Sequence, residues 1–243
     1  MKNIKYKSKQ ISEFYRMNRM KYSDFYLSEK NIIESVLQKN DKKSVLDIGC
    51  ACGGLGKALS EEFNISSYTG IDINQEAIEW AKKNNKLNIP HQYIAGDILH
   101  ETVNQADIVF SLSCADWNIE TDAIIQKSWE QVKRGGILIL SLRLTNKDSI
   151  NDITKSYQYI DFFEKNDKKE KANYVIFNIK DIFKIFNSLS PKVSEINAYG
   201  YYGSPSQSAN VPYDKLLFAV FALKKDASSE CNIKLNFPLD IFL

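Results

Sequence analysis

The segment Val45-Leu-Asp-Ile-Gly-Cys-Ala-Cys-Gly-Gly-Leu-Gly56 joins a short apolar run to a glycine-rich turn and then to a helical pattern. Glycine has no Cβ, so the backbone of such a turn can adopt positive φ and approach a ligand closely. We therefore predict a strand at 44–49, a helix at 53–62 and a ligand-binding turn between them.

The same alternation of strand and helix continues after this turn. Apolar runs that predict strands lie at 68–72, 91–96, 106–111 and 136–141, and helical patterns lie at 75–84 and 122–133. Short strands separated by helices are typical of βαβ units and a parallel sheet. The sequence therefore predicts an α/β protein whose core spans residues 44–144.

The segments on either side of this core are more polar. Residues 1–43 carry aromatic side chains among Lys and Arg and end in a helical pattern, which predicts a helical lid. Residues 145–172 are predicted to form an insertion that contains one helix, near 150–163.

The C-terminal part is predicted to complete a single domain of 243 residues. Residues 173–224 form a closing unit with a helix at 180–189 and two strands, at 193–202 and 216–223. The tail at 225–243 is partly apolar and is expected to pack against the domain.

The composition excludes several classes of protein. No apolar run reaches the roughly 18 residues of a membrane-spanning helix, and the polar start lacks the apolar region of a signal peptide. We therefore expect a cytoplasmic protein. The 32 basic and 30 acidic residues nearly balance, which disfavours membranes and nucleic acids as partners. Lys outnumbers Arg 28 to 4, a bias that suggests an AT-rich bacterial genome.

The sequence predicts no metal centre. His91 and His100 are the only histidines, and the four cysteines form no CxxC pair and no zinc spacing. In a cytoplasmic protein these cysteines are expected to be reduced thiols.

Asp47 distinguishes between two cofactor classes that use such a turn. Gly49, Ala51 and Gly54 match the GxGxxG pattern of dinucleotide-binding proteins loosely. An acidic residue two positions before the first glycine would, however, place negative charge beside a pyrophosphate. The same carboxylate would stabilise a ligand that carries an ammonium group.

The Asp-x-Gly-x-(small)-x-Gly pattern from Asp47 to Gly53 resembles motif I of the class I S-adenosylmethionine-dependent methyltransferases, with Ala51 where the family usually has Gly. The resemblance covers residues 28–144 well and 173–224 loosely. It implies a Rossmann-like, doubly wound and mostly parallel seven-stranded sheet with a reversed C-terminal β-hairpin. It also implies S-adenosylmethionine as cofactor.

The resemblance implies a role for several residues toward this cofactor. Asp72, 25 residues after Asp47, would accept hydrogen bonds from the ribose hydroxyls, Ile73 would lie against the adenine, and Asp97 would contact the adenine amino group. The complete set of predicted cofactor-binding residues is Asp47, Gly49, Cys50, Ala51, Gly53, Asp72, Ile73, Asp97, Ile98 and Ser113. Arg16 and Arg19, in the predicted lid, are candidates to reach the cofactor carboxylate.

The acceptor of the methyl group is less well defined. It is expected beside the loop at 113–118, where Asp116 could act as a general base or orient a hydroxyl group. Arg143, just after the fifth predicted strand, could pair with a phosphate or carboxylate. These two are the predicted catalytic residues. Trp117 and a group of tyrosines (Tyr199, Tyr201 and Tyr202) could line the acceptor pocket or pack in the core.

The prediction is therefore a methyltransferase that modifies a small polar acceptor, most readily at oxygen, with phosphorylated or sugar-like compounds as candidates. Three alternatives stay open. The same fold could act on RNA or protein, it could be a non-catalytic cofactor-binding partner subunit, or the chain could be a nicotinamide-dependent oxidoreductase. Monomer and homodimer are both compatible with the sequence.

Overall fold

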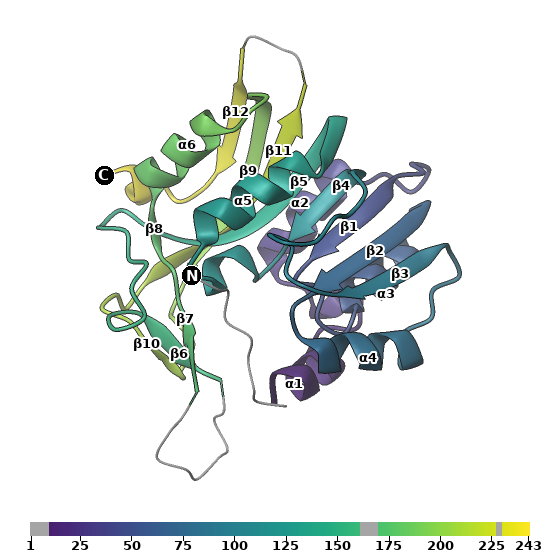
Figure 1. Ribbon diagram of the computed structural model, residues 1–243. Coiled ribbons are helices and arrows are strands. Elements are labelled where there is room, and N and C mark those ends of the chain that lie inside the picture. Colours follow the sequence, from purple (N-terminus) through teal and green to yellow (C-terminus); the bar gives the residue numbers. More distant parts are fainter. Residues whose placement is uncertain (1–9, 161–169, 227–229) are drawn as a thin grey trace.

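One sheet runs through the protein in the computed structural model, which describes residues 10–160, 170–226 and 230–243 (Figure 1). In spatial order its strands are β12 (Asn232–Asn236), β9 (Val193–Gly203), β11 (Leu216–Lys225), β5 (Val132–Thr145), β4 (Ala106–Ser111), β1 (Ser44–Ile48), β2 (Ser67–Asp72) and β3 (His91–Ala95). The short β8 (Phe177–Asn178) also pairs with β5.

The sheet is mostly parallel, as predicted. β11 runs antiparallel to both of its neighbours, β5 and β9, and so forms the reversed strand of the closing hairpin. All seven predicted strands are present, and β12 and β8 extend the sheet beyond them. β5 is longer than predicted and includes Arg143, which the sequence analysis had placed just after the strand.

Helices cover both faces of the sheet, which makes it doubly wound (Figure 1). α5 (Thr121–Glu130) and α6 (Ile179–Ser188) pack on one face, in a core that includes Leu46 and Leu140. α2 (Leu27–Val36), α3 (Gly54–Glu62) and α4 (Gln75–Asn84) pack on the other face, in a core that includes Val45 and Ile139.

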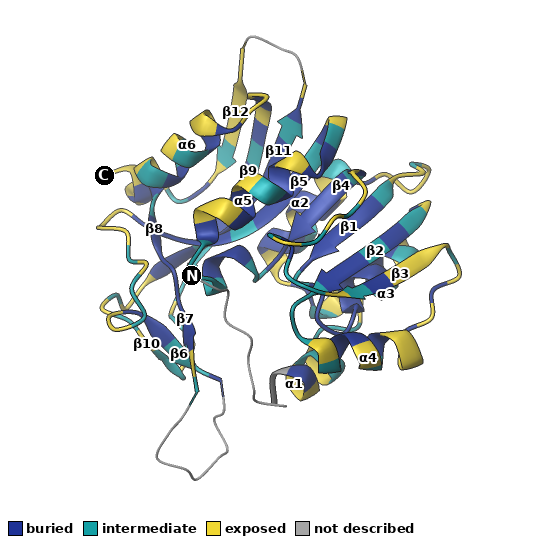
Figure 2. Ribbon diagram, in the orientation of Figure 1, coloured by how far each residue is buried: buried dark blue, intermediate teal, exposed yellow. Residues whose placement is uncertain are grey.

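The alternation of side chains along each strand explains these two cores, because successive residues point to opposite faces. β1 supplies Val45 to one core and Leu46 to the other, and β5 supplies Leu138 and Ile139 in the same way. Figure 2 shows the resulting pattern: the central strands are buried, and the outer faces of the helices are exposed.

The prediction of a helix at 150–163 is wrong for the residues that the structure describes there. Asp152 accepts a hydrogen bond from the backbone N–H of Thr154, which favours a turn over a helix. β6 (Tyr157–Tyr159) then pairs with β7 (Lys171–Asn173) and β10 (Ala209–Asn210) in a second, three-stranded sheet, which we call the cap sheet. It joins the predicted insertion to the connection between β9 and β11.

The N-terminal segment lies against the turn after β1. α1 (Gln10–Asn18) and the short helical turn η1 (Tyr22–Asp24) precede α2. A Cβ at Gly54 would overlap the carbonyl oxygen of Arg19, so the absence of a side chain at Gly54 lets the two backbones meet. Residues 1–9 of the predicted lid, 161–169 of the predicted insertion and 227–229 of the predicted tail lie outside the described residues.

The C-terminal tail extends the sheet. β12 pairs in parallel with β9, Phe237 packs against Phe221, and Ile241, in the short helical turn η3 (Leu239–Phe242), is buried.

Helices long and apolar enough to cross a membrane do not occur in the described ranges.

Trp129 is the largest side chain that is completely buried between α5 and the sheet, and its indole N–H donates to the carbonyl of Pro191 at 2.8 Å. We expect Trp129→Ala to lower the free energy of unfolding by about 3–5 kcal/mol, because it leaves a cavity and an unpaired carbonyl. Chemical denaturation would measure the change. The matched variant Trp80→Ala changes a half-buried indole and should cost much less; equal losses would contradict this account.

Candidate functional site

A cavity of about 850 Å³ lies at the carboxyl ends of β1, β2, β3 and β4. The direction of strand order reverses between β1 and β4, and ligands of open α/β sheets bind at such a switch point. The cavity continues from these strand ends to the cap sheet and the N-terminal segment.

The turn after β1 has a left-handed backbone at every second residue. The φ angles are +78° at Gly49, +46° at Ala51 and +74° at Gly53. A Cβ at Gly49 would collide with the side chain of Cys114, which packs directly on this turn. Ala51 is therefore the residue of the three that pays a steric penalty for its conformation.

Asp72 holds this turn in place from the end of β2. Its Oδ2 accepts from the backbone N–H of Ala51 at 2.8 Å, and its Oδ1 accepts from the backbone N–H of Asn74 at 2.7 Å. Each carboxylate oxygen can accept a second hydrogen bond, and Asp72 lines the large cavity. Burial raises the pKa of Asp72, and the two backbone hydrogen bonds oppose that rise.

The structure gathers five more of the predicted cofactor-binding residues around the same cavity, namely Gly49, Ile73, Asp97, Ile98 and Ser113. Ile73 and Ile98 add apolar surface, and Asp97 accepts from the backbone N–H of Leu99 at 3.0 Å. Ser113 has a φ of +49°, and its backbone N–H donates to Ser141 at 2.7 Å. Ala51 lines the cavity as well.

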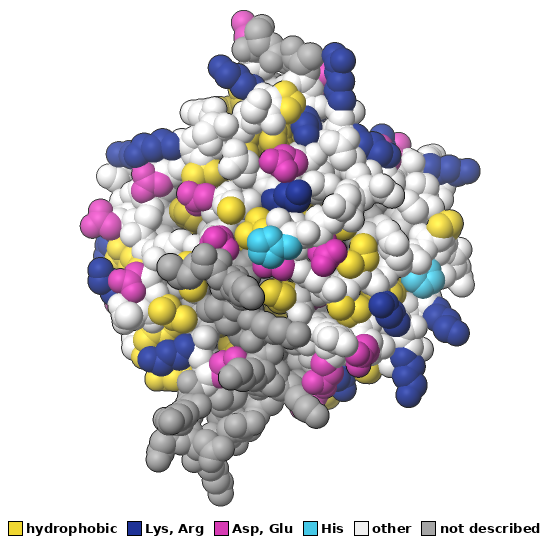
Figure 3. Space-filling view, viewed as in Figure 1, with side chains coloured by type: hydrophobic (Ala, Val, Ile, Leu, Met, Phe, Trp, Pro, Cys, Tyr) yellow, Lys and Arg dark blue, Asp and Glu magenta, His cyan; other side chains and the backbone are white. Residues whose placement is uncertain are grey.

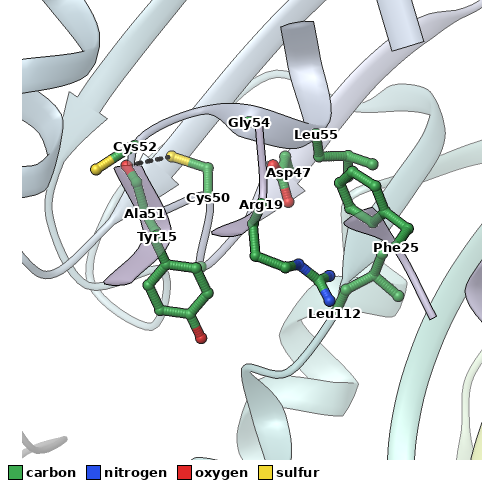
Figure 4. A pocket seen from close by; sticks show the side chains of 11 residues that line it. Tyr15, Arg19, Phe25, Asp47, Cys50, Ala51, Cys52, Gly54, Leu55 and Leu112 are labelled. Carbon is green, nitrogen blue, oxygen red and sulfur yellow. Dashed lines mark hydrogen bonds between the residues drawn. The ribbon is translucent and has the colours of Figure 1, made fainter. Parts of the chain in front are cut away.

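Asp47 and Arg19 share a smaller pocket of about 30 Å³ beside the turn (Figure 4). Asp47 is buried at the end of β1, where the hydroxyl of Tyr68 donates to its Oδ2 at 2.7 Å. Burial raises the pKa of Asp47 to about 7, against the lowering effect of the Tyr68 hydrogen bond. The pocket therefore offers an acidic and a basic group within one enclosure, as an amino acid would require.

Arg19, and not Arg16, is the lid arginine that lines this pocket and the large cavity. It forms an ion pair of 2.9 Å with the buried Glu29 and lies 4.4 Å from the ring centre of Phe25. Arg16 instead pairs with Glu76 at 3.3 Å.

Besides Asp47, two other predicted cofactor-binding residues, Cys50 and Gly53, do not line the large cavity. Cys50 lines the small pocket, with its thiol directed at the carbonyl of Ala51. Gly53 precedes α3, and the space beside it is filled by Tyr93 and Asn85. Its contribution to the site is the shape of the turn.

Asp116 and Arg143 are paired with each other. Arg143 Nε donates to Asp116 Oδ2 at 2.6 Å, and a terminal guanidinium nitrogen donates to the Asp116 carbonyl at 2.8 Å. Both side chains are buried in the wall of the large cavity. The positive charge of Arg143, which was predicted to pair with an anionic acceptor, is thus paired with Asp116 in the structure, while one terminal guanidinium nitrogen has no hydrogen-bond partner among the described residues.

Tyr174 and Trp117 surround this ion pair. The guanidinium lies 3.6 Å from the ring centre of Tyr174 and 4.9 Å from that of Trp117. Trp117 and Tyr174 line the cavity, and so does Tyr201, whereas Tyr199 and Tyr202 do not. Tyr199 packs against the core under α2, and Tyr202 lies under Lys215, 3.5 Å from its ring centre.

The sequence analysis missed the residues that the cap sheet and α2 bring to the site. Gln158 and Tyr159 line the cavity from a segment for which a helix was predicted, and Tyr174 follows β7. The sequence contained one pattern that could have indicated a role for Glu29, a Glu at the third position of a helix. In the structure Glu29 accepts a hydrogen bond from the backbone N–H of Tyr26 at 2.8 Å, as in a capping box. The N-cap residue is Tyr26, and not the usual Ser or Thr.

Groups of three or more His, Cys, Asp or Glu side chains that could hold a metal ion are absent from the part of the chain that the structure describes. Cys114 also has no feature of a nucleophile. Burial raises the pKa of its thiol well above the usual range, which keeps it protonated.

Comparison with known proteins supports one family. Residues 39–187 match the family model described as a methyltransferase domain. A malonyl-[acyl-carrier protein] O-methyltransferase of Acetivibrio thermocellus is 26% identical over 175 residues, or 69% of this chain and 60% of the relative. A ubiquinone biosynthesis O-methyltransferase of Coxiella burnetii is 30% identical over 120 residues, or 48% of this chain and 47% of the relative. The chain spans about half the length of the curated relatives it matches.

Solved structures share the fold at low sequence identity. A phosphoethanolamine N-methyltransferase 2 of Haemonchus contortus, in complex with S-adenosyl-L-methionine, matches with a TM-score of 0.59 and 14% identity, over 89% of this chain and 56% of that one.

Ala51 provides a test of the strained turn. We expect Ala51→Gly to raise the free energy of unfolding by about 1 kcal/mol, because glycine adopts positive φ without a Cβ clash. In the following helix, the same substitution at Ala58 should lower stability instead, since it removes a buried methyl group and adds backbone freedom. Thermal or urea unfolding of both variants would check the opposite signs. A destabilised Ala51→Gly would contradict the strain.

Asp47 provides a test of the buried charge. A carboxyl group whose pKa is raised to about 7 in the folded protein contributes stability below pH 4, and that contribution is lost as the pH rises to 7. We expect Asp47→Asn to remove this dependence and to be more stable than the parent at pH 8, by about 2–4 kcal/mol. Urea unfolding across pH 4–8, without ligand, would measure it. Parallel pH profiles for the two proteins would refute the burial effect.

Proposed function

Because the chain belongs to the methyltransferase-domain family of class I S-adenosylmethionine-dependent methyltransferases, we propose that it methylates a hydroxyl oxygen of a small polar acceptor. The observation that carries the cofactor assignment is that Asp47 and Arg19 line the same pocket beside the turn. Opposite charges at this point suit the ammonium and carboxylate groups of an amino acid, whereas a dinucleotide pyrophosphate would face Asp47.

The residues around the turn fit S-adenosylmethionine in chemical type. Arg19 would hold the carboxylate, Asp47 the ammonium group, and the free lone pairs of Asp72 the ribose hydroxyls. Ile73 and Ile98 supply apolar surface for the adenine, with Asp97 near its amino group. When bound, S-adenosylmethionine supplies a methyl group whose C–S bond breaks as the acceptor oxygen bonds to carbon, leaving S-adenosylhomocysteine.

Asp116 is the proposed proton acceptor for the hydroxyl group. It follows Ser113 in the loop after β4, and Arg143 fixes one of its oxygens. Its Oδ1 has no hydrogen-bond partner among the described residues. An oriented carboxylate of this kind can remove the proton that the acceptor loses as its oxygen becomes methylated. Arg143 is thus a positioning residue.

The distribution of charge favours a small molecule over RNA. On the face shown in Figure 3, Lys and Arg side chains are scattered and mixed with Asp and Glu. A basic stripe is the usual footprint of an RNA-binding protein. The names of the two O-methyltransferase relatives support oxygen as the methylated atom.

Calorimetry with S-adenosylhomocysteine tests the cofactor assignment. We expect binding of S-adenosylhomocysteine and no binding of NADH, and we expect Asp72→Ala to weaken binding by about 1–3 kcal/mol because ribose hydroxyls lose their acceptors. Asp107→Ala is the matched control. Asp107 bonds Ser44 and Lys133 at the opposite ends of the strands, so its loss should leave affinity unchanged. Binding of NADH alone would overturn the proposed function.

Turnover separates an enzyme from a non-catalytic subunit. S-adenosylmethionine with a labelled methyl group, incubated with the protein and a set of small hydroxy compounds, should yield labelled product. Tight cofactor binding with no turnover on any compound would favour the partner-subunit alternative.

A further inference from the structure

We propose that the acceptor is an uncharged molecule that carries its hydroxyl group on a planar aromatic ring. This inference rests on the proposed function, because it concerns the part of the large cavity beyond the cofactor-binding residues. It is drawn from the side chains that line that part and from their charges.

Aromatic side chains reach the cavity from several separate parts of the chain. Tyr201 and Phe218 come from the paired strands β9 and β11, Trp117 and Tyr174 come from the segments around the ion pair, Tyr159 comes from the cap sheet, and Tyr26 comes from the start of α2. Because these rings come from distant segments and line a cavity, their surfaces are available to a ligand. Flat aromatic ligands gain both apolar burial and ring–ring contact in such a cavity.

Four of these rings are held by contacts within the protein. Tyr201 and Phe218 are paired across β9 and β11, with ring centres 6.3 Å apart and ring planes inclined by 34°. Tyr174 is fixed by the Arg143 guanidinium at 3.6 Å and lies 6.1 Å from Trp117. Side chains that are already ordered lose little conformational entropy on binding, so a rigid planar ligand is favoured.

The charges that line the cavity disfavour an anionic acceptor. Among the described residues of its lining, Arg19 and Arg143 are the cationic side chains, against four acidic ones, Glu29, Asp72, Asp97 and Asp116. Arg143, the arginine of this lining that lies beyond the cofactor-binding residues, is already paired with Asp116 at 2.6 Å. The excess acidic groups, Asp72 and Asp97, lie at the cofactor end, so a phosphate or carboxylate acceptor beyond it would meet a balanced ion pair and no unpaired cation among the described lining residues. The same excess suits a sulfonium cofactor.

Neutral hydrogen-bonding groups remain for substituents of the ring. Gln158 donates to Ser206 at 3.2 Å and to Ser208 at 2.9 Å, and all three line the cavity. Amide and hydroxyl groups can exchange such bonds with neutral polar substituents without the cost of burying a charge. The lining thus combines ring surface with uncharged polar groups.

A set of three matched probes tests ring and charge separately. Catechol carboxamide is neutral and aromatic, catechol carboxylate adds a negative charge, and cyclohexanediol carboxamide replaces the aromatic ring by a saturated one. With S-adenosylmethionine present, we expect kcat/KM for catechol carboxamide to exceed both others by about tenfold or more, which corresponds to about 1.4 kcal/mol. Release of S-adenosylhomocysteine would measure each rate.

Two outcomes of this test would overturn the proposal. One is equal or better turnover of the carboxylate or the saturated analogue, which would indicate an anionic or sugar-like acceptor. The other is the absence of methyl transfer to all three probes while S-adenosylhomocysteine still binds, which leaves the cofactor assignment intact. Failure to bind S-adenosylhomocysteine would instead overturn the proposed function, and this proposal with it.

Variants on one strand locate the effect. Tyr201→Leu removes a ring from the cavity and should raise KM for catechol carboxamide by about tenfold, whereas Tyr201→Phe should keep it near the parent value. Tyr202→Leu is the matched control, because the neighbouring Tyr202 does not line the cavity and lies against Lys215. Affinity for S-adenosylhomocysteine should be unchanged in all three. An unchanged KM in Tyr201→Leu would contradict the role of the ring.

Discussion

The hydrogen bond that Asp72 accepts from the backbone N–H of Ala51, in the turn after β1, is the constraint on which the site depends. The carboxylate ties the backbone of Ala51 to the end of β2 and holds a left-handed conformation that an alanine disfavours. Because the turn is held in this shape, Cys114 can pack on Gly49 and the backbone of Arg19 can pack on Gly54. The loop after β4 and the N-terminal segment therefore take their places from one turn.

The buried carboxyl groups of the site lower the stability of the folded protein when they are ionised. Asp47 is buried beside Asp72, and both carboxyl groups have raised pKa values because burial disfavours their charged forms. Arg19, beside the turn, and Arg143, farther from it, are each paired with an acidic partner. The site thus separates into a region with acidic groups, which suits a cationic cofactor, and a region of paired charges and aromatic rings, which suits a neutral acceptor.

The sequence was most informative where structure is local. The Asp-x-Gly pattern predicted the turn, and the spacing of apolar runs predicted the parallel strands and the helices between them, since period and turn chemistry are properties of a few consecutive residues. The helix predicted near 150–163 was wrong because the structure of residues 157–159 depends on partners that are not local in sequence. Tyr157 and Gln158 form a strand only because β7 and β10, distant in sequence, pair with them.

The sequence by itself determined the α/β class, the turn between β1 and α3, and the acidic residues at the strand ends, because all of these follow from residue type and short spacing. Only the tertiary structure decided that Asp116 and Arg143 neutralise each other, that Arg19 and not Arg16 faces the pocket, and that Tyr201 and Tyr174 line one cavity. Asp116 and Arg143 are 27 positions apart in the sequence. The other arrangements bring together residues from different helices and strands. Such contacts depend on how the strands and the cap sheet are placed in space, and no local pattern records that placement.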